Sequence, residues 1–341
     1  MIKTETQGKA AKAVEGQSGR LRRLLHRPEA GGAIAALLVF AFFAILAGHN
    51  GFLSLLGTAY WLDTASELGI IAIPVGMLMI GGEFDLSVGA VVGATSMIVA
   101  ICSGSYGLPG WLGFTLAVIF GAAVGAANGL IVVKTRLPSF IVTLSTMLMV
   151  TGSILGVSIA LTGSSSISAI PNDFLGVLVA FKWHEFHVSI LYWVLFGAAA
   201  IYVMERTSFG NWTYATGGNV LTARLAGVPT DRVKVILFIL SSLGAVMVGT
   251  IETYNFQNGS ITLGAQYVFS GIAACVIGGV LLTGGHGSLL GTAFGATTYG
   301  IVSLGVFFLG WNADLTELFI GMLLLVAVIT NNRLRLLAMG R

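Results

Sequence analysis

The stretch Ile71–Ala100, IAIPVGMLMIGGEFDLSVGAVVGATSMIVA, carries two acidic residues inside an otherwise apolar tract. On insertion scales, one carboxylate near the middle of a membrane-spanning helix costs roughly 2.5–3.5 kcal/mol. A chain therefore tolerates Glu83 and Asp85 only where the backbone turns, where water reaches or where function needs a charge. Gly81 and Gly82 supply the flexible backbone that a turn requires. The stretch predicts an internal turn or a functional site within the depth of a membrane.

The composition around this stretch is that of a membrane protein. Of the 341 residues, 56% are hydrophobic and only 9% are charged, and the mean hydropathy is +0.92. Such a chain has too few charges to cover a soluble globule. Its length suffices for about ten spans of roughly 20 residues each. We therefore predict an all-α polytopic membrane protein with about ten transmembrane helices.

The apolar runs divide the chain into these ten spans. They are Gly31–Gly48, Leu62–Ile80, Val88–Ser103, Trp111–Val133, Phe140–Leu161, Val188–Met204, Val235–Ile251, Tyr267–Leu282, Ser288–Leu309 and Leu315–Thr330. With the N-terminus inside, every lysine and arginine except Lys182 falls on the cytoplasmic side, as the positive-inside rule requires. Both termini are therefore predicted to be cytoplasmic. The second and eighth runs are candidates for broken or re-entrant helices.

Three regions follow from this topology. Residues 1–30 form a basic cytoplasmic tail, residues 31–332 the transmembrane domain, and residues 333–341 a second cytoplasmic tail. The basic cluster Arg20–Arg27 is expected to lie against anionic lipid headgroups. The net charge of +3 does not indicate a nucleic-acid partner.

An internal echo accompanies the acidic stretch. MIGGEFDLSVGAVVGAT, beginning at Met79, is similar to LTGGHGSLLGTAFGAT, beginning at Leu282, if one residue is dropped. In the predicted topology both copies begin at the same membrane face, so the echo indicates a parallel duplication of a helix block. The alternative is a chance similarity between two glycine-rich spans.

The longest predicted cytoplasmic loop, residues 205–234, contains the start and stop signals of a short helix. Asn219 is a good N-cap, Val220–Ala226 can form two turns, and Gly227 suits a left-handed C-terminal position. Leu221 and Leu225 then share one face at i,i+4. An exposed helix with an apolar face is typical of a segment that binds a groove on another protein or a headgroup layer.

Metal and nucleotide sites are not indicated. No pair of cysteines or histidines has metal-ligand spacing, and His184 and His187 are expected at the surface of an external loop. Cys102 and Cys275 are expected to be small buried hydrophobes. No GxxxxGK motif followed by Ser or Thr occurs, so ATP would have to be handled by another protein.

Two sets of polar residues are candidates for contact with a solute. The first, assigned to a translocation path or gate, comprises Glu83, Asp85, Ser87 and Asn128. Alternatively, Asp85 caps a helix at an internal turn and Asn128 makes a hydrogen bond between packed helices. The second set, Glu67, Glu252, Asn255 and Gln257, is assigned to an external mouth that receives a polyhydroxyl solute or contacts another protein. Its alternative is a group of solvated helix ends.

Four motifs carry a family resemblance that covers essentially the whole chain after residue 30. They are GGEFDLSVG at Gly81–Gly89, NGLIVVKTRLPSFIVTLSTM at Asn128–Met147, YATGGN with RLAGV within Tyr214–Val228, and GGVLLTGGHGSLLGT at Gly278–Thr292. In this order and spacing the chain resembles the permease subunits of bacterial ATP-binding-cassette sugar importers of the ribose, galactose and xylose type.

The resemblance implies a homodimer of permeases in the bacterial inner membrane. It also implies cytoplasmic ATPase subunits that handle ATP and Mg²⁺, and an extracytoplasmic sugar-binding protein. The segment that docks into the ATPase corresponds to Gly217–Val228, with the positions Gly218, Asn219, Leu221, Arg224, Leu225 and Gly227. The chain departs from the family where Val220, Leu221 and Thr222 replace a common Glu-Ala-Ala, so a docking contact from that Glu is in doubt.

The expected function is therefore that of a transport subunit without catalytic residues or a bound cofactor. It would pass a small sugar by alternating access, coupled to separate ATPases. Alternatives are a permease for an amino acid, nucleoside or polyol, and an ion-coupled secondary carrier. A lipid-linked transferase would require a cluster such as DDxxD, which the sequence lacks.

Overall fold

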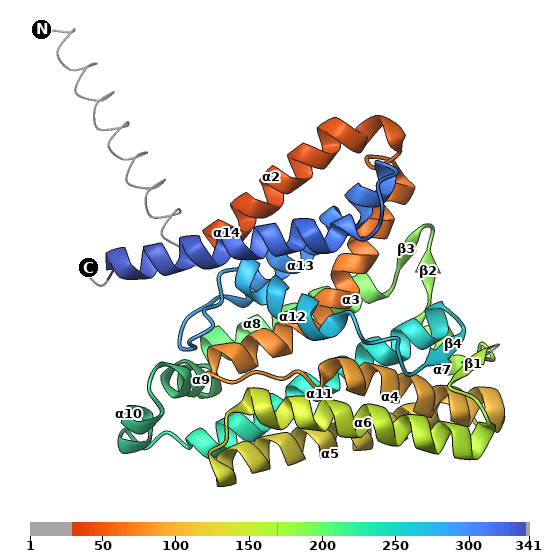
Figure 1. The fold of residues 1–341 in the computed structure, drawn as a ribbon, viewed down its shortest axis with the longest axis horizontal. Helices are drawn as coiled ribbons and strands as arrows, with labels where there is room; N and C mark the ends of the chain where they lie inside the picture. Colours follow the sequence, from red (N-terminus) through yellow and green to blue (C-terminus); the bar gives the residue numbers. More distant parts are fainter. Residues whose placement is uncertain (1–28, 169, 339–341) are drawn as a thin grey trace, which may run out of the picture.

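The computed structural model describes residues 29–168 and 170–338, which form one helical bundle (Figure 1). Its helices are α2 (Ala30–Ala47), α3 (Leu55–Ile80), α4 (Val88–Ala100), α5 (Gly110–Thr135), α6 (Ser139–Thr162), α7 (Phe174–Val179), α8 (Ser189–Arg206), α9 (Ser208–Gly218), α10 (Val220–Leu225), α11 (Thr230–Asn255), α12 (Tyr267–Ile277), α13 (Leu289–Phe308) and α14 (Leu315–Ala338). A 3-10 turn (Gly48–Asn50) follows α2, and a π-helical turn (Ile101–Ser105) extends α4.

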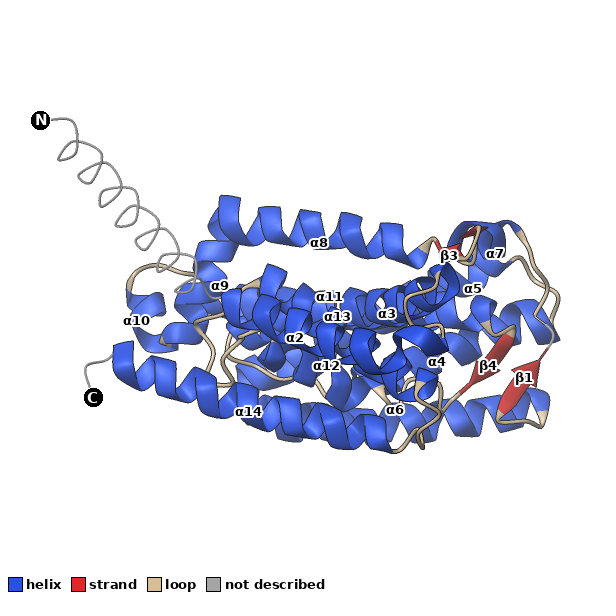
Figure 2. Cartoon of the chain, turned by 90° about the horizontal axis from the view of Figure 1, so that it is seen from above, coloured by secondary structure: helices blue, strands red, loops and turns tan. Residues whose placement is uncertain are grey.

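Four short strands complete the fold. Strand β1 (Ser166–Ser168) pairs antiparallel with β4 (Asn258–Ser260), and β2 (Lys182–Trp183) pairs antiparallel with β3 (Phe186–His187). All four lie at one end of the bundle, which we call the β end (Figure 2). Helices α9 and α10 lie at the opposite end, the α10 end, where α14 also terminates. The α10 end is the one that the charge pattern predicts to be cytoplasmic.

The predicted class is confirmed. Among the described residues, eight helices are long and apolar enough to cross a membrane, and two shorter apolar helices, Tyr267–Ile277 and Leu315–Thr330, match the two remaining predicted runs. The most apolar windows of Leu55–Ile80 and Val88–Ser105 are each 83% buried, against 28% for Ser139–Thr162 and 17% for Ser189–Arg206. Helices α3 and α4 therefore form the centre, and α6 and α8 present apolar side chains outward, as lipid contact requires.

The predicted break in the second run is wrong. Helix α3 continues unbroken through Pro74 and ends only at Ile80. The break follows it, in the buried segment Gly81–Ser87, which we call link 1. The eighth run is interrupted as predicted, because α12 ends at Ile277 and a longer segment, Gly278–Ser288 or link 2, leads to α13.

The two links begin with the same turn, and this corrects the register of the echo. Gly82 and Gly279 have φ of +85° and +93°. The N–H group of Glu83 donates to the Leu78 carbonyl at 3.1 Å, and that of Val280 donates to the Cys275 carbonyl at 3.0 Å. This is the glycine C-cap of a Schellman motif, formed twice. The matching dipeptide in the second copy is thus Gly278-Gly279, rather than the later glycine pair that the sequence comparison aligned.

The predicted tails fall only partly within the structure. Residues 1–28 of the basic tail lie outside the described residues, as do 339–341 of the C-terminal tail. Helix α14 continues into the region predicted as tail, as far as Ala338.

Candidate functional site

Asp85 in link 1 is fully buried and has a hydrogen-bond donor for each carboxylate oxygen. Its Oδ1 accepts from the Ser87 N–H at 2.9 Å and from the Ser87 hydroxyl at 2.5 Å. Its Oδ2 accepts from the Ser241 hydroxyl on α11 at 2.9 Å. Asp85 therefore closes an Asx turn just before α4 and ties it to α11, while the N-cap residue of α4 is Ser87, whose side chain makes no cap hydrogen bond. The alternative of a helix cap is wrong in this detail, although the carboxylate does accept from a nearby backbone N–H.

The same network continues into α5 and α6. Asn128 Nδ2 donates to the Ser87 hydroxyl at 3.0 Å, and the Thr146 hydroxyl donates to Asn128 Oδ1 at 2.7 Å. Asp85, Ser87 and Asn128, all predicted to line a path, are thus brought together. Asn128 makes the hydrogen bond between packed helices that was its alternative role. Ser241 and Thr146 were not predicted, because hydroxyl groups in an apolar helix ordinarily bond their own backbone and give no signal in the sequence.

Glu83 does not join this network. Its carboxylate forms an ion pair with Lys234 at the start of α11, and the two side chains are only 10% and 15% exposed. The backbone beside it is also fixed, since the Phe84 N–H donates to the Ser139 hydroxyl at 3.0 Å and the Leu86 N–H to the Thr143 hydroxyl at 3.1 Å. Link 1 is therefore held from several sides, by side chains of α5, α6 and α11.

Helix α10 has the local structure that the sequence predicts. Asn219 Oδ1 accepts from the Thr222 N–H at 3.0 Å, and Gly227 adopts a φ of +84°. Leu221 and Leu225 are 70% and 83% exposed. Arg224 turns back on the chain: its Nε donates to the Thr230 hydroxyl at 2.9 Å, and its guanidinium pairs with Asp231. The two leucines are therefore the most prominent exposed side chains of α10, while its cation, itself 43% exposed, is paired within the chain.

Helix α9 was not predicted. It buries Gly210, Thr213 and Thr216 toward the bundle, at a spacing of three residues. This is helical periodicity carried by small and hydroxylated residues, so a hydropathy scan does not register it. The spacing of small residues was the signal that was available.

Close glycine contacts join α9 to both links. A Cβ atom on Gly217 would lie 1.8 Å from the Ile80 carbonyl oxygen, and one on Gly285 would lie 2.6 Å from Gly218 Cα. A Cβ on Gly284 would lie 2.7 Å from Gly82 Cα. The Gly285 N–H also donates to the Ile80 carbonyl at 2.8 Å. We call these five glycines, Gly82, Gly217, Gly218, Gly284 and Gly285, the glycine junction.

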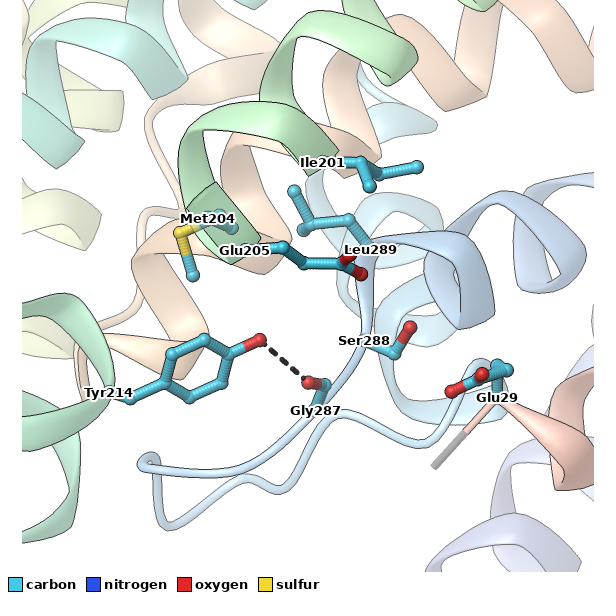
Figure 3. Close-up of a pocket in the computed structure, with 8 residues that line it drawn as sticks. All are labelled: Glu29, Ile201, Met204, Glu205, Tyr214, Gly287, Ser288 and Leu289. Carbon is cyan, nitrogen blue, oxygen red and sulfur yellow. Dashed lines mark hydrogen bonds between the residues drawn. The ribbon is translucent and has the colours of Figure 1, made fainter. Parts of the chain in front are cut away.

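A side-chain bond ties α9 to link 2 beside the junction. The Tyr214 hydroxyl donates to the Gly287 carbonyl at 3.0 Å, across the mouth of a cavity of about 120 Å³ (Figure 3). Glu29, Glu205 and Ser288 also line this cavity. The end of α8, the start of α2 and link 2 therefore meet α9 at one place.

The predicted external mouth divides into a buried and an exposed part. Glu252 is only 2% exposed, and its Oε1 accepts from the Tyr267 hydroxyl at 2.6 Å. Glu67 Oε1 accepts from Asn255 Nδ2 at 3.2 Å. The alternative of solvated helix ends is thus wrong for Glu252. Gln257 is exposed and lies apart from these bonds, at the lining of a cavity of about 320 Å³ that Asn255 also lines.

Other polar residues at the β end cap or brace the loops. His187 Nδ1 lies 2.5 Å from Asp63 Oδ2, so the prediction of a surface histidine is wrong for His187. Asp173 caps α7. Burial alone would raise the pKa of Asp173, but hydrogen bonds from the backbone N–H groups of Gly176 and Gly110 outweigh it and hold this pKa below its ordinary value. In the described part of the chain, no group of three His, Cys, Asp or Glu side chains is placed to hold a metal ion.

Comparison with known proteins decides the family. The model of a family described as "Branched-chain amino acid transport system / permease component" matches residues 57–328. The chain belongs to this family. The permease is 32% identical to the fructose import permease protein of Rhizobium meliloti over 328 residues, 94% of this chain and 89% of the relative.

Two further relatives agree with this assignment. The permease is 30% identical to the ribose import permease protein of Escherichia coli (strain K12) over 278 residues, 80% of this chain and 84% of the relative. It is 28% identical to the xylose transport system permease protein of the same strain, over 77% of this chain and 81% of the relative. No solved structure matches the permease. The resemblance carried by the four motifs is confirmed, and the chain is a transport subunit rather than an enzyme.

Proposed function

We propose that the permease is the membrane-spanning subunit of an ATP-driven importer in the bacterial inner membrane. It translocates a small sugar that an extracytoplasmic binding protein delivers. The observation that carries the proposal is α10, a capped helix that holds Leu221 and Leu225 out of the bundle at 70% and 83% exposure. Two relatives, a fructose import permease and a ribose import permease, support a sugar as the solute.

In this proposal α10 docks into a cleft of a cytoplasmic ATPase, which binds ATP and Mg²⁺. Burying one leucine side chain contributes roughly 1.5–3 kcal/mol, so two leucines supply a substantial part of a stable contact. The Glu that the family resemblance leads one to expect after Asn219 is absent here, and Arg224 is bonded within its own chain. The contact is therefore apolar, and Asn219 and Gly227 serve to shape the helix that presents it.

The glycine junction is the proposed route of coupling. Helix α9 precedes α10 directly, and the backbone of α9 touches the end of α3 and both links. Because backbone contacts leave no flexible side chain to absorb a displacement, a shift of α10 moves α9 against both links together. Two permease copies with two ATPases would then alternate between outward-open and inward-open states.

The test uses the permease co-expressed with its neighbouring ATPase. We expect the double variant Leu221→Ala/Leu225→Ala to bind the ATPase at least about 100-fold more weakly, since roughly 3 kcal/mol of apolar burial is lost. Leu178→Ala is the matched control, because Leu178 is also half exposed but belongs to α7 at the β end. Wild-type ATPase binding, together with a wild-type number of solutes moved per ATP in vesicles, would refute the docking claim.

A second solute class has one observation in its favour, the branched-chain amino acids in the family description. Thermal-shift screening of the neighbouring binding protein against sugars, amino acids, nucleosides and polyols distinguishes the classes, since a bound solute raises the Tm. An ion-coupled carrier would instead move solute at full rate without any ATPase. Uptake by the permease alone in vesicles with an ion gradient would establish that alternative.

A further inference from the structure

The buried part of the mouth leaves two polar atoms without hydrogen-bond partners. Asn255 Nδ2 donates to Glu67, and the Tyr267 hydroxyl donates to Glu252 Oε1. Glu252 Oε2 and Asn255 Oδ1 are both buried, and neither has a hydrogen-bond partner. We call Glu67, Glu252, Asn255 and Tyr267 the acceptor cluster. It joins α3, α11 and the start of α12.

What the cluster lacks is a partner for these two atoms. No polar atom of the described chain forms a hydrogen bond with either, and leaving a buried polar atom unpaired costs roughly 1–3 kcal/mol. Turning the Asn255 amide over would supply no remedy, because its nitrogen would then occupy the same unpartnered position. The group that completes the cluster must therefore come from outside the chain, and a hydroxyl suits both atoms because it can donate and accept.

Neither a basic side chain nor a metal ion is placed to do this. Glu67 and Glu252 form no ion pair with a lysine, arginine or histidine of the described ranges, unlike Asp63, Asp231 and Glu83. In the described ranges, no group of three His, Cys, Asp or Glu side chains could hold a metal ion, and this includes the acceptor cluster. A partner from outside the chain remains: water fills such a place when the site is at rest, and the hydroxyl groups of an uncharged solute can replace it.

A cavity leads to the cluster from the β end. It has a volume of about 320 Å³, and Asn255 lines it together with Tyr254 and Phe181. Phe181 is 53% exposed, so it forms part of the rim. Asn255 thus has one face in the cavity and its amide on Glu67. Aromatic walls beside a few polar groups are typical of sites for small polar ligands.

We propose that the acceptor cluster is a passage site for an uncharged, hydroxyl-rich solute, whose hydroxyls donate to Glu252 and Asn255. The inference rests on the proposed function and adds to it the buried residues that the solute contacts on its way through. Asn255 separates the cavity from Glu252 in the present state, and a solute reaches the carboxylates when the Asn255 amide leaves Glu67. The site is occupied only in transit.

The experiment uses the complete importer in proteoliposomes, with permease, ATPase and binding protein. Uptake of ribose, fructose and xylose is measured first, at saturating loaded binding protein, to find a sugar that the wild type carries. Glu252→Gln replaces one acceptor oxygen by a donor at nearly constant shape, and Glu67→Gln is the second variant. We expect at least about a tenfold fall in uptake per ATP for Glu252→Gln, the loss that corresponds to 1.4 kcal/mol.

The control variant is Glu317→Gln, since Glu317 is an exposed acid on α14. It should carry sugar within about twofold of wild type, a difference well under the tenfold step of 1.4 kcal/mol. Tm and yield in detergent are measured for each variant, so that a folding defect is recognised by a lowered Tm.

Deoxy analogues of the carried sugar then separate contact from structure. For wild type, removing the hydroxyl that meets Glu252 should lower uptake, whereas Glu252→Gln should show no further loss with that analogue. Parallel losses for sugar and analogues in both proteins would overturn the passage site alone, as would wild-type uptake by both glutamine variants. A wild-type complex that hydrolyses ATP but carries none of the three sugars would overturn the proposed function and the site together.

Discussion

Links 1 and 2 begin with the same glycine turn, yet different contacts hold them. Link 1 is fixed by side chains, through Asp85, Ser87 and the Glu83–Lys234 pair. Link 2 is held through its backbone, by the Gly285 N–H on Ile80 and by the Gly287 carbonyl under Tyr214. A network of side chains fixes one geometry, whereas the close backbone contacts of link 2 with α9 pass on a displacement. In the proposed coupling, link 1 is therefore the anchor and link 2 is the part that follows α9.

The largest effect is expected at the glycine junction. A methyl group at Gly217 would lie 1.8 Å from the Ile80 carbonyl oxygen, so the backbone of α9 or α3 must shift. We expect Gly217→Ala to lower the free energy of unfolding by about 3 kcal/mol or more, measured by thermal unfolding in detergent. At Gly218 a Cβ meets nothing within 4 Å, so Gly218→Ala is the control. Equal stability of the two variants would contradict the close contact.

The second effect tests link 1 as the anchor. Asp85→Ala removes the acceptor for Ser87 and Ser241, and charged hydrogen bonds contribute roughly 1.5–3 kcal/mol each. We expect a loss of stability in that range, measured by denaturant unfolding. A double-mutant cycle with Ser241→Ala should show strong coupling. Additive losses would mean that the bond between Ser241 and Asp85 does not hold the link.

The third effect tests link 2. Tyr214→Phe removes one neutral hydrogen bond to the Gly287 carbonyl, so stability should fall by only about 0.5–1.5 kcal/mol. The number of solutes moved per ATP should fall by a larger factor than this loss of stability explains, because the bond lies on the proposed coupling route. Tyr202→Phe is the control, since Tyr202 is 64% exposed on α8. An unchanged ratio of solute to ATP would show that link 2 does not follow α9.

The smallest effect is expected at Asp173, the cap of α7 at the β end. The pKa of Asp173 is lowered in the folded state, so the stability it contributes is present above the ordinary carboxyl pKa. That contribution is lost as the pH falls below about 4, through the lowered pKa. We expect Asp173→Asn to remove part of the acid dependence of Tm between pH 5 and pH 3, a window set by ordinary carboxyl pKa values of roughly 4. Asp314→Asn, at an exposed acid, should leave that dependence as it is in the wild type.

Local signals made part of this architecture predictable from the sequence. Asn219, Gly227 and Pro229 punctuate α10 within a few residues, and the structure has that helix with Asn219 as its cap. Long apolar runs likewise predicted the spans, because insertion into lipid depends on the hydropathy of a run and not on which helix packs beside it. The resemblance of four ordered motifs then pointed to the family that the comparisons confirm.

Features that depend on tertiary contact were beyond the sequence. Glu252 stands near the end of an apolar run, where a solvated side chain is a reasonable expectation. In the structure the hydroxyl of Tyr267 on the neighbouring α12 bonds it, a contact that the sequence does not indicate. Helix α9 packs by glycine and threonine, which have no strong hydropathy, so its buried face was invisible. The equivalence of the two links rests on φ values at Gly82 and Gly279, which letters alone do not distinguish from those of nearby glycines.

The pairing of Arg224 within its own loop has a consequence for how the importer assembles. Its guanidinium is bonded to Thr230 and Asp231, so the tip of α10 presents two leucine side chains and a cation whose charge is balanced within the chain. In the proposed docking, the contact with the ATPase is therefore mainly apolar. Dissolved ions weaken attraction between charges over about 10 Å at 0.1 M, and they leave apolar contact largely intact. Washing with concentrated sodium chloride should strip loosely held basic proteins from these membranes and leave the ATPase in place.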